Sequence, residues 1–302
     1  MQLKQTLASA IIRLNAEHIP SPRMNAELLL MFTLNCDRAY LYGHPERELT
    51  GDEHSRYEAA LAERARGVPA QYITGHQEFW GMDLIVSPAV LIPRPETEHM
   101  IETVLELHAS ASGVQRPASG PQISAVGVSE SRKPGAGSRI LDLGTGSGCI
   151  ALALAKELPH ADIHASDISA PALEIARANA GRHQLESRIQ FHQTDLLTGF
   201  ENSSFDFIVS NPPYVGDSEE DEVQLEVRKF EPRNAVFAGP TGLEVIQRLI
   251  PQAHAALRPG GWLVMEISGT VSEEVRQLLE GWNDVRIRPD LQSIPRVAQA
   301  RK

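Results

Sequence analysis

From Arg139 to the end of the chain, short apolar runs alternate with amphipathic helical patterns. Apolar runs of this length between turn residues are typical of buried parallel strands, and their alternation with helices is typical of a sheet covered on both faces. The expected strands are 140–143, 163–166, 189–191, 205–210, 262–267, 285–287 and 296–298, and the expected helices are 149–158, 171–183, 243–257 and 272–279. This pattern predicts an α/β domain with a mostly parallel, seven-stranded sheet.

The first 75 residues have a different pattern. Apolar residues recur at helical spacing over 3–14, 26–32 and 57–65, and prolines and glycines separate these stretches. We expect a small all-helical domain over 1–75. The helices alone leave open whether it is a structural appendage or a module that recognises a partner.

A linker and an insertion complete the predicted organisation. Residues 76–98 contain the apolar runs 79–86 and 90–92 and predict a hairpin-like linker, with a helix opening near its end. The α/β domain then covers 99–302. Within it, residues 109–138 are rich in Ser, Gly and Pro and poor in large apolar residues, which predicts a flexible insertion with no catalytic role.

Composition excludes several classes of protein. The chain is 42% hydrophobic and 22% charged, and its longest apolar stretch, 149–155, is far below the roughly 20 residues of a membrane span. No apolar leader is visible, so a cytoplasmic location is expected. The two cysteines, Cys36 and Cys149, lack metal-ligand spacing, so no metal site is expected. A net charge of -11 disfavours nucleic acid as the main substrate.

A glycine-rich loop separates the first strand of the α/β domain from its helix. Glycines at this place let a ligand approach the backbone closely. The spacing is G-x-G-x-G, and a dinucleotide fingerprint is not met because Cys149 stands where its last glycine belongs. The spacing and the preceding aspartate resemble the S-adenosylmethionine loop of class I methyltransferases, and a turn without a ligand is the alternative. The candidate contacts are Asp142, Gly144, Thr145, Gly146, Ser147 and Gly148.

Polar residues also follow the next three strands. Asp167 ends the second strand, where a carboxylate can accept both hydroxyls of a ribose. Asp195 follows the third strand, where it can meet an adenine amine beside the backbone of Leu196. Either aspartate alone is more often a cap or turn residue. Because carboxyl ends of parallel strands meet at one edge, we expect both to join the glycine loop and Asn211 in one cofactor site.

Asn211-Pro212-Pro213-Tyr214 follows the fourth strand. Its two prolines lack backbone donors and have fixed φ angles, which makes the loop stiff. The Asn211 side-chain oxygen and the Pro212 carbonyl are two acceptors suited to an NH2 group, and the Tyr214 ring can stack on a planar group. A plain strand-ending turn is the alternative interpretation.

With these residues the chain resembles the HemK/PrmC family of peptide chain release factor glutamine methyltransferases. The Asn-Pro-Pro-Tyr motif is shared with adenine-amine methyltransferases, whereas Ile-Pro-Arg-Pro-Glu-Thr-Glu at 92–98 is far more specific. The resemblance covers most of 68–300 and is carried by 69–75, 78–81, 91–98, 142–153, 167–169, 208–214, 231–233 and 266–267.

The resemblance implies a Rossmann-like class I methyltransferase domain and a helical domain that recognises the substrate. The implied reaction transfers a methyl group from S-adenosyl-L-methionine to the glutamine side-chain amide of the release factor's Gly-Gly-Gln motif, leaving S-adenosyl-L-homocysteine. Asn211 and Pro212 would then orient the amide nitrogen without a strong general base, and Tyr214 would form a wall beside Pro213. Phe79 fits either a cover over the substrate or core packing, and Arg94 fits either a substrate contact or an ion pair between domains.

Two other functions are compatible with parts of this pattern. A nucleic-acid methyltransferase would use the same tetrapeptide on a flipped adenine or on a guanine amine, but it requires a basic groove. A non-catalytic adaptor would bind the cofactor only structurally. The acidic segment 217–222 is either a solvated loop or a surface that steers a basic patch on a protein substrate.

Overall fold

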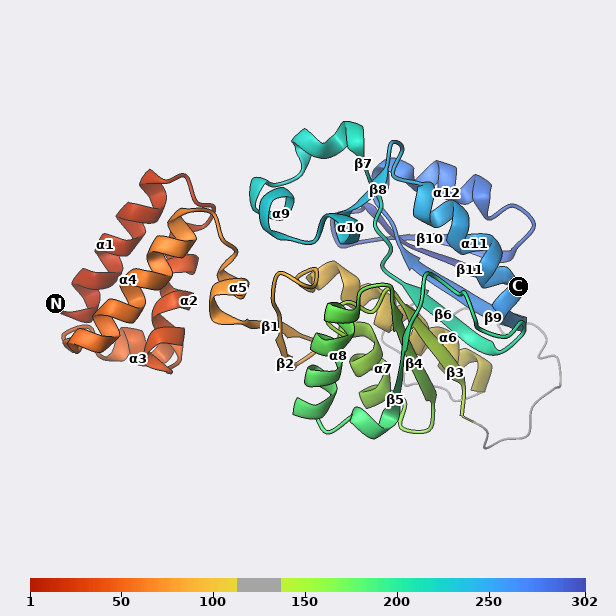
Figure 1. The fold of residues 1–302 in the computed structure, drawn as a ribbon, viewed down its shortest axis with the longest axis horizontal. Coiled ribbons are helices and arrows are strands. Elements are labelled where there is room, and N and C mark those ends of the chain that lie inside the picture. The colour runs from red at the N-terminus through yellow and green to blue at the C-terminus, as the bar shows by residue number, and fades with distance from the viewer. Residues whose placement is uncertain (113–136) are drawn as a thin grey trace.

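The computed structural model describes residues 1–112 and 137–302 (Figure 1). Helix α6 (Glu98–Ser112) covers the start of the expected insertion at 109–138, so that stretch begins inside a helix rather than in a loop. The rest of that prediction, residues 113–136, lies outside the described residues.

The N-terminal region forms a helical domain with its own core. Leu14, Leu29, Leu30 and Tyr57 are fully buried in it. Two short helices, α3 and α5, were not predicted, because six and five residues are too few to show a helical period. The helices are α1 (Leu3–Ala16), α2 (Pro22–Leu34), α3 (Arg38–Gly43), α4 (Gly51–Ala65) and α5 (Ala70–Thr74).

A two-stranded hairpin joins this domain to the rest of the chain. Strands β1 (His76–Phe79) and β2 (Met82–Ile85) are antiparallel, and the turn is at Trp80 and Gly81, which both have positive φ. Adjacent positive φ angles suit the twist of a tight hairpin. The two apolar runs, 79–86 and 90–92, predicted a break between them at Ser87-Pro88. That position was wrong, because the hairpin turn lies inside the first run.

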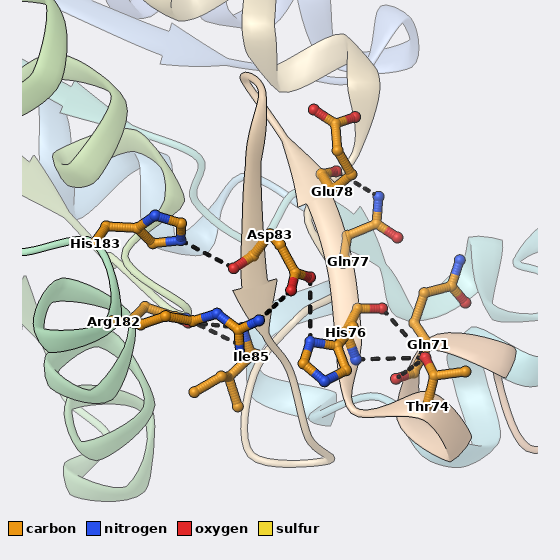
Figure 2. A network of polar contacts seen from close by, with 10 residues as sticks. Gln71, Thr74, His76, Gln77, Glu78, Asp83, Ile85, Arg182 and His183 are labelled. Atoms are coloured by element: carbon orange, nitrogen blue, oxygen red, sulfur yellow. Dashed lines mark hydrogen bonds and ion pairs between the residues drawn. The ribbon is translucent and has the colours of Figure 1, made fainter. Parts of the chain in front are cut away.

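The hairpin is tied to the neighbouring helices on both sides (Figure 2). Asp83 pairs with Arg182 at the end of α8 (Ala170–Arg182), and its carbonyl oxygen lies 2.9 Å from Nε2 of His183. On the other side, Thr74 at the end of α5 hydrogen-bonds with the backbone of His76. The hairpin is therefore held between the helical domain and α8.

The second half of the chain contains the expected seven-stranded sheet. The strand order is β10-β11-β9-β6-β3-β4-β5, and β11 is antiparallel to both of its neighbours. The remaining pairings, β9-β6-β3-β4-β5, are parallel. The strands are β3 (Arg139–Leu143), β4 (Asp162–Asp167), β5 (Ile189–Gln193), β6 (Phe205–Ser210), β9 (Leu257–Glu266), β10 (Asn283–Pro289) and β11 (Pro295–Arg301).

Helices cover both faces of this sheet, as alternating side chains require. Ile140 faces the core under α6, α7 (Cys149–Glu157) and α8, whereas Leu141 faces the core under α11 (Glu244–Ala256) and α12 (Ser272–Leu278). The strand order reverses between β3 and β6, and open α/β sheets bind ligands at the carboxyl ends of such strands. Short elements complete the described structure: η1 (Pro95–Thr97) in the linker, and η2 (Glu186–Arg188), β7 (Val215–Gly216), η3 (Asp217–Glu222), α9 (Leu225–Phe230), α10 (Arg233–Val236), β8 (Phe237–Gly239) and η4 (Gly269–Val271) in the α/β domain.

Candidate active site

A cavity of about 330 Å³ lies where β3, β4 and β6 end. Its size falls in the range of small-molecule and cofactor sites. The structure brings residues from the glycine loop, from three later strand ends and from the linker into one wall. The residues predicted from sequence that line it are Gly144, Thr145, Gly146, Ser147, Asp167, Asp195, Leu196, Asn211, Pro212, Pro213 and Arg94.

Two glycines open the loop toward this cavity. Gly144 and Gly146 have φ angles of +73° and +54°, and a Cβ added at either would meet no atom within 4 Å. The backbone N–H groups of Gly144 and Thr145 both donate to the carbonyl oxygen of Ser166, at 2.8 and 2.9 Å. The loop is thus pinned to the end of β4 while its glycines leave room for a ligand.

Gly148 has a packing role instead of the ligand contact predicted for it. It does not line the cavity, and a Cβ there would lie 2.8 Å from Cδ1 of Leu152 and 3.2 Å from Cβ of Ala176. Leu152 belongs to α7 and Ala176 to α8. The missing side chain at Gly148 lets these two helices approach each other beneath the loop.

Asp142 also lies behind the cavity wall, although it was predicted as a cofactor contact. Its Oδ2 accepts hydrogen bonds from Oγ1 of Thr145 (2.6 Å) and the backbone N–H of Ala151 (3.0 Å). Its Oδ1 is buried without a hydrogen-bond partner among the described residues. Burial, together with the nearby charge of Asp167, outweighs these two bonds and raises the pKa of Asp142 to about 7. Asp142 therefore braces the loop.

Asp167 combines loop support with a position in the wall. Its Oδ2 accepts from the Gly146 N–H and its Oδ1 from the Ser169 N–H, both at 2.9 Å. Burial raises the pKa of this carboxyl against the effect of those bonds. Each carboxylate oxygen can accept more than one hydrogen bond, so Asp167 can also receive two hydroxyls from the cavity.

Sequence reasoning missed two residues beside Asp167 and Asp195. Ile168 lines the cavity and is 58% exposed, so it offers an apolar surface next to the carboxylate of Asp167. Arg248 of α11 lines the cavity too, and its Nη2 lies 2.5 Å from Oδ2 of Asp195. The position of Ile168 directly after a strand-end aspartate was a usable signal. The Arg248 pairing depends on tertiary structure alone.

Asn211 is held from behind by a chain of hydrogen bonds. Its Nδ2 donates to Oγ1 of Thr97 (3.3 Å), and that hydroxyl donates to Oε2 of Glu266 (2.6 Å). Tyr214 donates to the other oxygen of Glu266, at 3.1 Å. Tyr214 does not line the cavity, and its hydroxyl supports the residues behind Asn211; its place as a wall of the glutamine slot stays a prediction. Thr97 and Glu266 lay in the segments that carry the resemblance, yet neither had been given a role.

Of the two linker residues predicted to contact the substrate, one lines the cavity and the other does not. Arg94 lines the cavity and also pairs with the buried carboxylate of Glu231 at 2.5 Å, whose second oxygen accepts from the Ile92 N–H. Phe79, which was predicted as a substrate contact, is fully buried in the core and does not line the cavity. The hairpin register turns Phe79 inward, so we leave it out of the site.

Comparisons with known proteins show the family to which this chain belongs. Residues 5–75 match the model of the PrmC N-terminal domain, and 125–229 match that of the methyltransferase small domain. A release factor glutamine methyltransferase of Koribacter versatilis is 52% identical over 100% of this chain and 99% of its own length. The chain belongs to the release factor glutamine methyltransferase family. The enzyme of that name from Chlorobaculum tepidum is 40% identical, over 97% of this chain and 94% of its own.

Solved structures share the fold of this release factor glutamine methyltransferase family member. The hMettl16 catalytic domain, in complex with a MAT2A 3′UTR hairpin, has a TM-score of 0.53 and 17% identity over 87% of this chain and 84% of its own. A T. thermophilus 16S rRNA methyltransferase, in complex with AdoMet and guanosine, has a TM-score of 0.51 and 20% identity over 75% of this chain and 49% of its own. At these identities the likeness concerns the fold alone.

As a member of this family, the protein is an S-adenosyl-L-methionine-dependent methyltransferase. The cavity suits that cofactor: Gly144 and Gly146 leave space beside the backbone, Asp167 offers acceptors for ribose hydroxyls, and Ile168 offers an apolar surface for a flat base. Among residues 1–112 and 137–302, no group of three or more His, Cys, Asp or Glu side chains is arranged to hold a metal ion. In the same ranges, no helix is both long and apolar enough to cross a membrane.

Proposed function

We propose that this chain transfers the methyl group of S-adenosyl-L-methionine to the side-chain amide nitrogen of the glutamine in the Gly-Gly-Gln motif of peptide chain release factors. Membership of the release factor glutamine methyltransferase family supports this activity. The observation in the structure that carries it is the position of Asn211 and Pro212, which line the same cavity as the glycine loop. An NH2 group bound there meets two acceptors next to the cofactor.

The chemistry needs orientation more than a base. An amide nitrogen is a weak nucleophile, because its lone pair is delocalised into the carbonyl. When bound, the cofactor supplies a methyl group on a positively charged sulfur. Hydrogen bonds from the substrate NH2 to Oδ1 of Asn211 and the carbonyl of Pro212 would aim the nitrogen and stabilise the charge that develops on it. The methyl carbon would leave the cofactor sulfur as its bond to the amide nitrogen forms, and the cationic amide would then lose a proton to water.

We further propose that the protein is organised as a substrate-recognition domain over 1–75, a linker over 76–98 and a catalytic domain over 99–302. The helical domain reaches the loop after Tyr214 directly: Nη2 of Arg64 in α4 lies 2.8 Å from Oε2 of Glu226 in α9. A protein substrate that enters the cavity beside this loop would meet both domains.

Nucleic acid is a poorer fit as the substrate. The net charge is -11, and the segment 217–222 beside the motif is acidic and mostly exposed. Part of its charge is neutralised, because Arg233 pairs with Glu220 and Asp217 while Arg228 pairs with Asp221. The remaining acidic groups would repel a phosphate backbone and attract a basic patch on a protein.

Methyl transfer from labelled cofactor tests the proposal. We expect label on a purified release factor, none on a release factor whose Gly-Gly-Gln glutamine is replaced by alanine, and none on adenine-containing DNA or RNA. Asn211→Ala should lower the rate on the release factor by at least about 100-fold, since orientation and charge stabilisation are both lost. Label on nucleic acid but not on the glutamine would reject the proposed substrate.

A further inference from the structure

Three side chains from different parts of the chain meet behind Asn211. Thr97 comes from η1 in the linker, Tyr214 from the loop after β6, and Glu266 from the end of β9. Thr97 and Glu266 are each 2% exposed, so water does not compete for their hydrogen bonds. Glu266 receives a hydroxyl on each oxygen, Thr97 at 2.6 Å and Tyr214 at 3.1 Å, and Thr97 lies 3.3 Å from Nδ2 of Asn211.

The chemistry of these groups determines which way each hydrogen bond runs. An ionised carboxylate only accepts hydrogen bonds, whereas a hydroxyl has one hydrogen and two lone pairs. The Thr97 hydroxyl therefore donates its single hydrogen to Glu266, and toward Asn211 it can only accept a hydrogen bond. The partner on Asn211 must then be its NH2 group, because its oxygen would face a second acceptor.

An amide with its nitrogen fixed on one side presents its oxygen on the other. We propose that Glu266 acts through Thr97 as a positioning residue that keeps the Asn211 side-chain oxygen available as the acceptor for the substrate NH2 group. This inference rests on the function proposed above. A reversed Asn211 amide would place its own NH2 group against the substrate NH2 group, and neither could accept.

The orientation of the Asn211 amide depends on the protonation state of Glu266. Burial raises the pKa of its carboxyl, while Thr97, Tyr214 and the positive charge of Arg296 lower it and Glu96 raises it further. The charge of Glu266 in turn helps to raise the pKa of the buried Cys149 thiol. A protonated Glu266 would donate to Thr97, and the Thr97 hydrogen would become free for the Asn211 oxygen. The Asn211 amide would then no longer have a preferred orientation.

Two substitutions remove the fixed direction of the hydrogen bonds behind Asn211 while leaving the shape of the site nearly unchanged. Thr97→Val deletes the hydroxyl, and Glu266→Gln replaces an obligate acceptor with a group that can also donate to Thr97. Thr97→Ser retains the hydroxyl. Thr103→Val is the matched control, because Thr103 is also buried but its hydroxyl donates to a carbonyl within helix α6, 2.8 Å away.

The experiment measures kcat and KM for the release factor between pH 6 and 9, and the Kd of S-adenosyl-L-methionine, for each variant. We expect kcat at alkaline pH to fall about 10- to 100-fold in Thr97→Val and Glu266→Gln, with the cofactor Kd within about twofold of the wild type. Thr97→Ser should stay within about threefold, and Thr103→Val should match the wild type. Because burial raises the pKa of Glu266, any rise of the wild-type kcat with pH that comes from its ionisation should be absent in Glu266→Gln.

Two results would overturn the inference alone: a Thr97→Val enzyme that is as fast as the wild type, or a Glu266→Gln enzyme that keeps both its rate and the acidic limb of its pH profile. A drop in kcat that Thr97→Ser does not rescue would also count against it, because the hydroxyl would then not be the cause. A wild-type enzyme that does not methylate the release factor would overturn the proposed function as well.

Discussion

At the scale of single residues, Asp167 and Asp195 carry similar sequence signals but have different partners. Asp167 lines the cavity and accepts hydrogen bonds from two backbone N–H groups. Asp195 instead pairs through one carboxylate oxygen with Arg248, and both side chains of that pair are about half exposed. We expect Asp167→Ala to raise the Kd of S-adenosyl-L-methionine by about 10- to 100-fold, since it would remove the charge-assisted hydrogen bonds proposed for the ribose hydroxyls. Asp195→Ala should raise it only a few-fold. Titration calorimetry measures both, and equal losses would contradict the ranking.

Asp142 predicts an unusual dependence of stability on pH. Its pKa is about 7 in the folded protein against an ordinary value of 3.8, so the folded state binds more protons than the unfolded state between these values. Its contribution to the free energy of unfolding should therefore fall as the pH rises from 4 to 7, by up to about 4 kcal/mol. Thr145 and Ala151 keep an acceptor in Asp142→Asn, which does not titrate.

Urea denaturation of the wild type and of Asp142→Asn across this pH range measures the effect. The difference in unfolding free energy, wild type minus variant, should decrease from pH 4 to pH 7 and then level off. Other carboxyl groups are common to both proteins and cancel in the difference. A difference that is independent of pH, or that grows with pH, would contradict the burial effect assigned to Asp142.

At the scale of elements, the packing of α7 against α8 depends on the absence of a side chain at Gly148. Gly148→Ala would place a methyl group 2.8 Å from Leu152 at a φ of +84°, and we expect a loss of about 1–3 kcal/mol in the free energy of unfolding. The cofactor Kd should also rise, because the glycine loop ends at this junction.

Gly181 provides the matched control for that substitution. It lies in α8, and a Cβ there would meet nothing within 4 Å. Alanine is favoured over glycine in a helix, so Gly181→Ala should stabilise the protein by about 0.5–1 kcal/mol. Thermal and chemical denaturation of both variants gives the comparison. If Gly148→Ala were as stable as Gly181→Ala, the close packing at Gly148 would not be energetically significant.

At the scale of the whole molecule, Arg64 connects the helical domain to the loop that follows the active-site motif. Its side chain is 3% exposed, and it donates to Oδ1 of Asn25, the carbonyl of Val68 and Oε2 of Glu226. Only the last of these contacts crosses to the catalytic domain. The pair thus links the orientation of the helical domain to α9, which lies on the side facing that domain (Figure 1).

Glu226→Ala should loosen this connection without unfolding either part. We expect faster hydrogen exchange in α9 and at the end of α4, a loss of about 1–3 kcal/mol in the local opening free energy, and an unchanged cofactor Kd. The control is Glu222→Ala, an exposed carboxylate in η3 that should leave exchange in α4 unchanged. Unchanged exchange in Glu226→Ala would show that other contacts hold the domains together.

The sequence by itself determined the sheet, the glycine loop and the strand-end residues, because apolar periodicity and turn chemistry are local properties. Strand β6 at Phe205–Ser210 has the predicted bounds, and the family resemblance is confirmed. Local patterns also place Asp167 and Asn211 at strand ends, and parallel topology makes such ends converge on one edge.

Only the tertiary structure decided which of these residues face the cavity and which support it. Asp142, Gly148 and Tyr214 belong to the right motifs but lie behind the wall, since loop backbone and helix packing turn them inward. Thr97 and Glu266 are 169 positions apart and meet only when the linker docks on the end of β9. Contacts over such separations depend on how whole elements pack, and no local pattern encodes them.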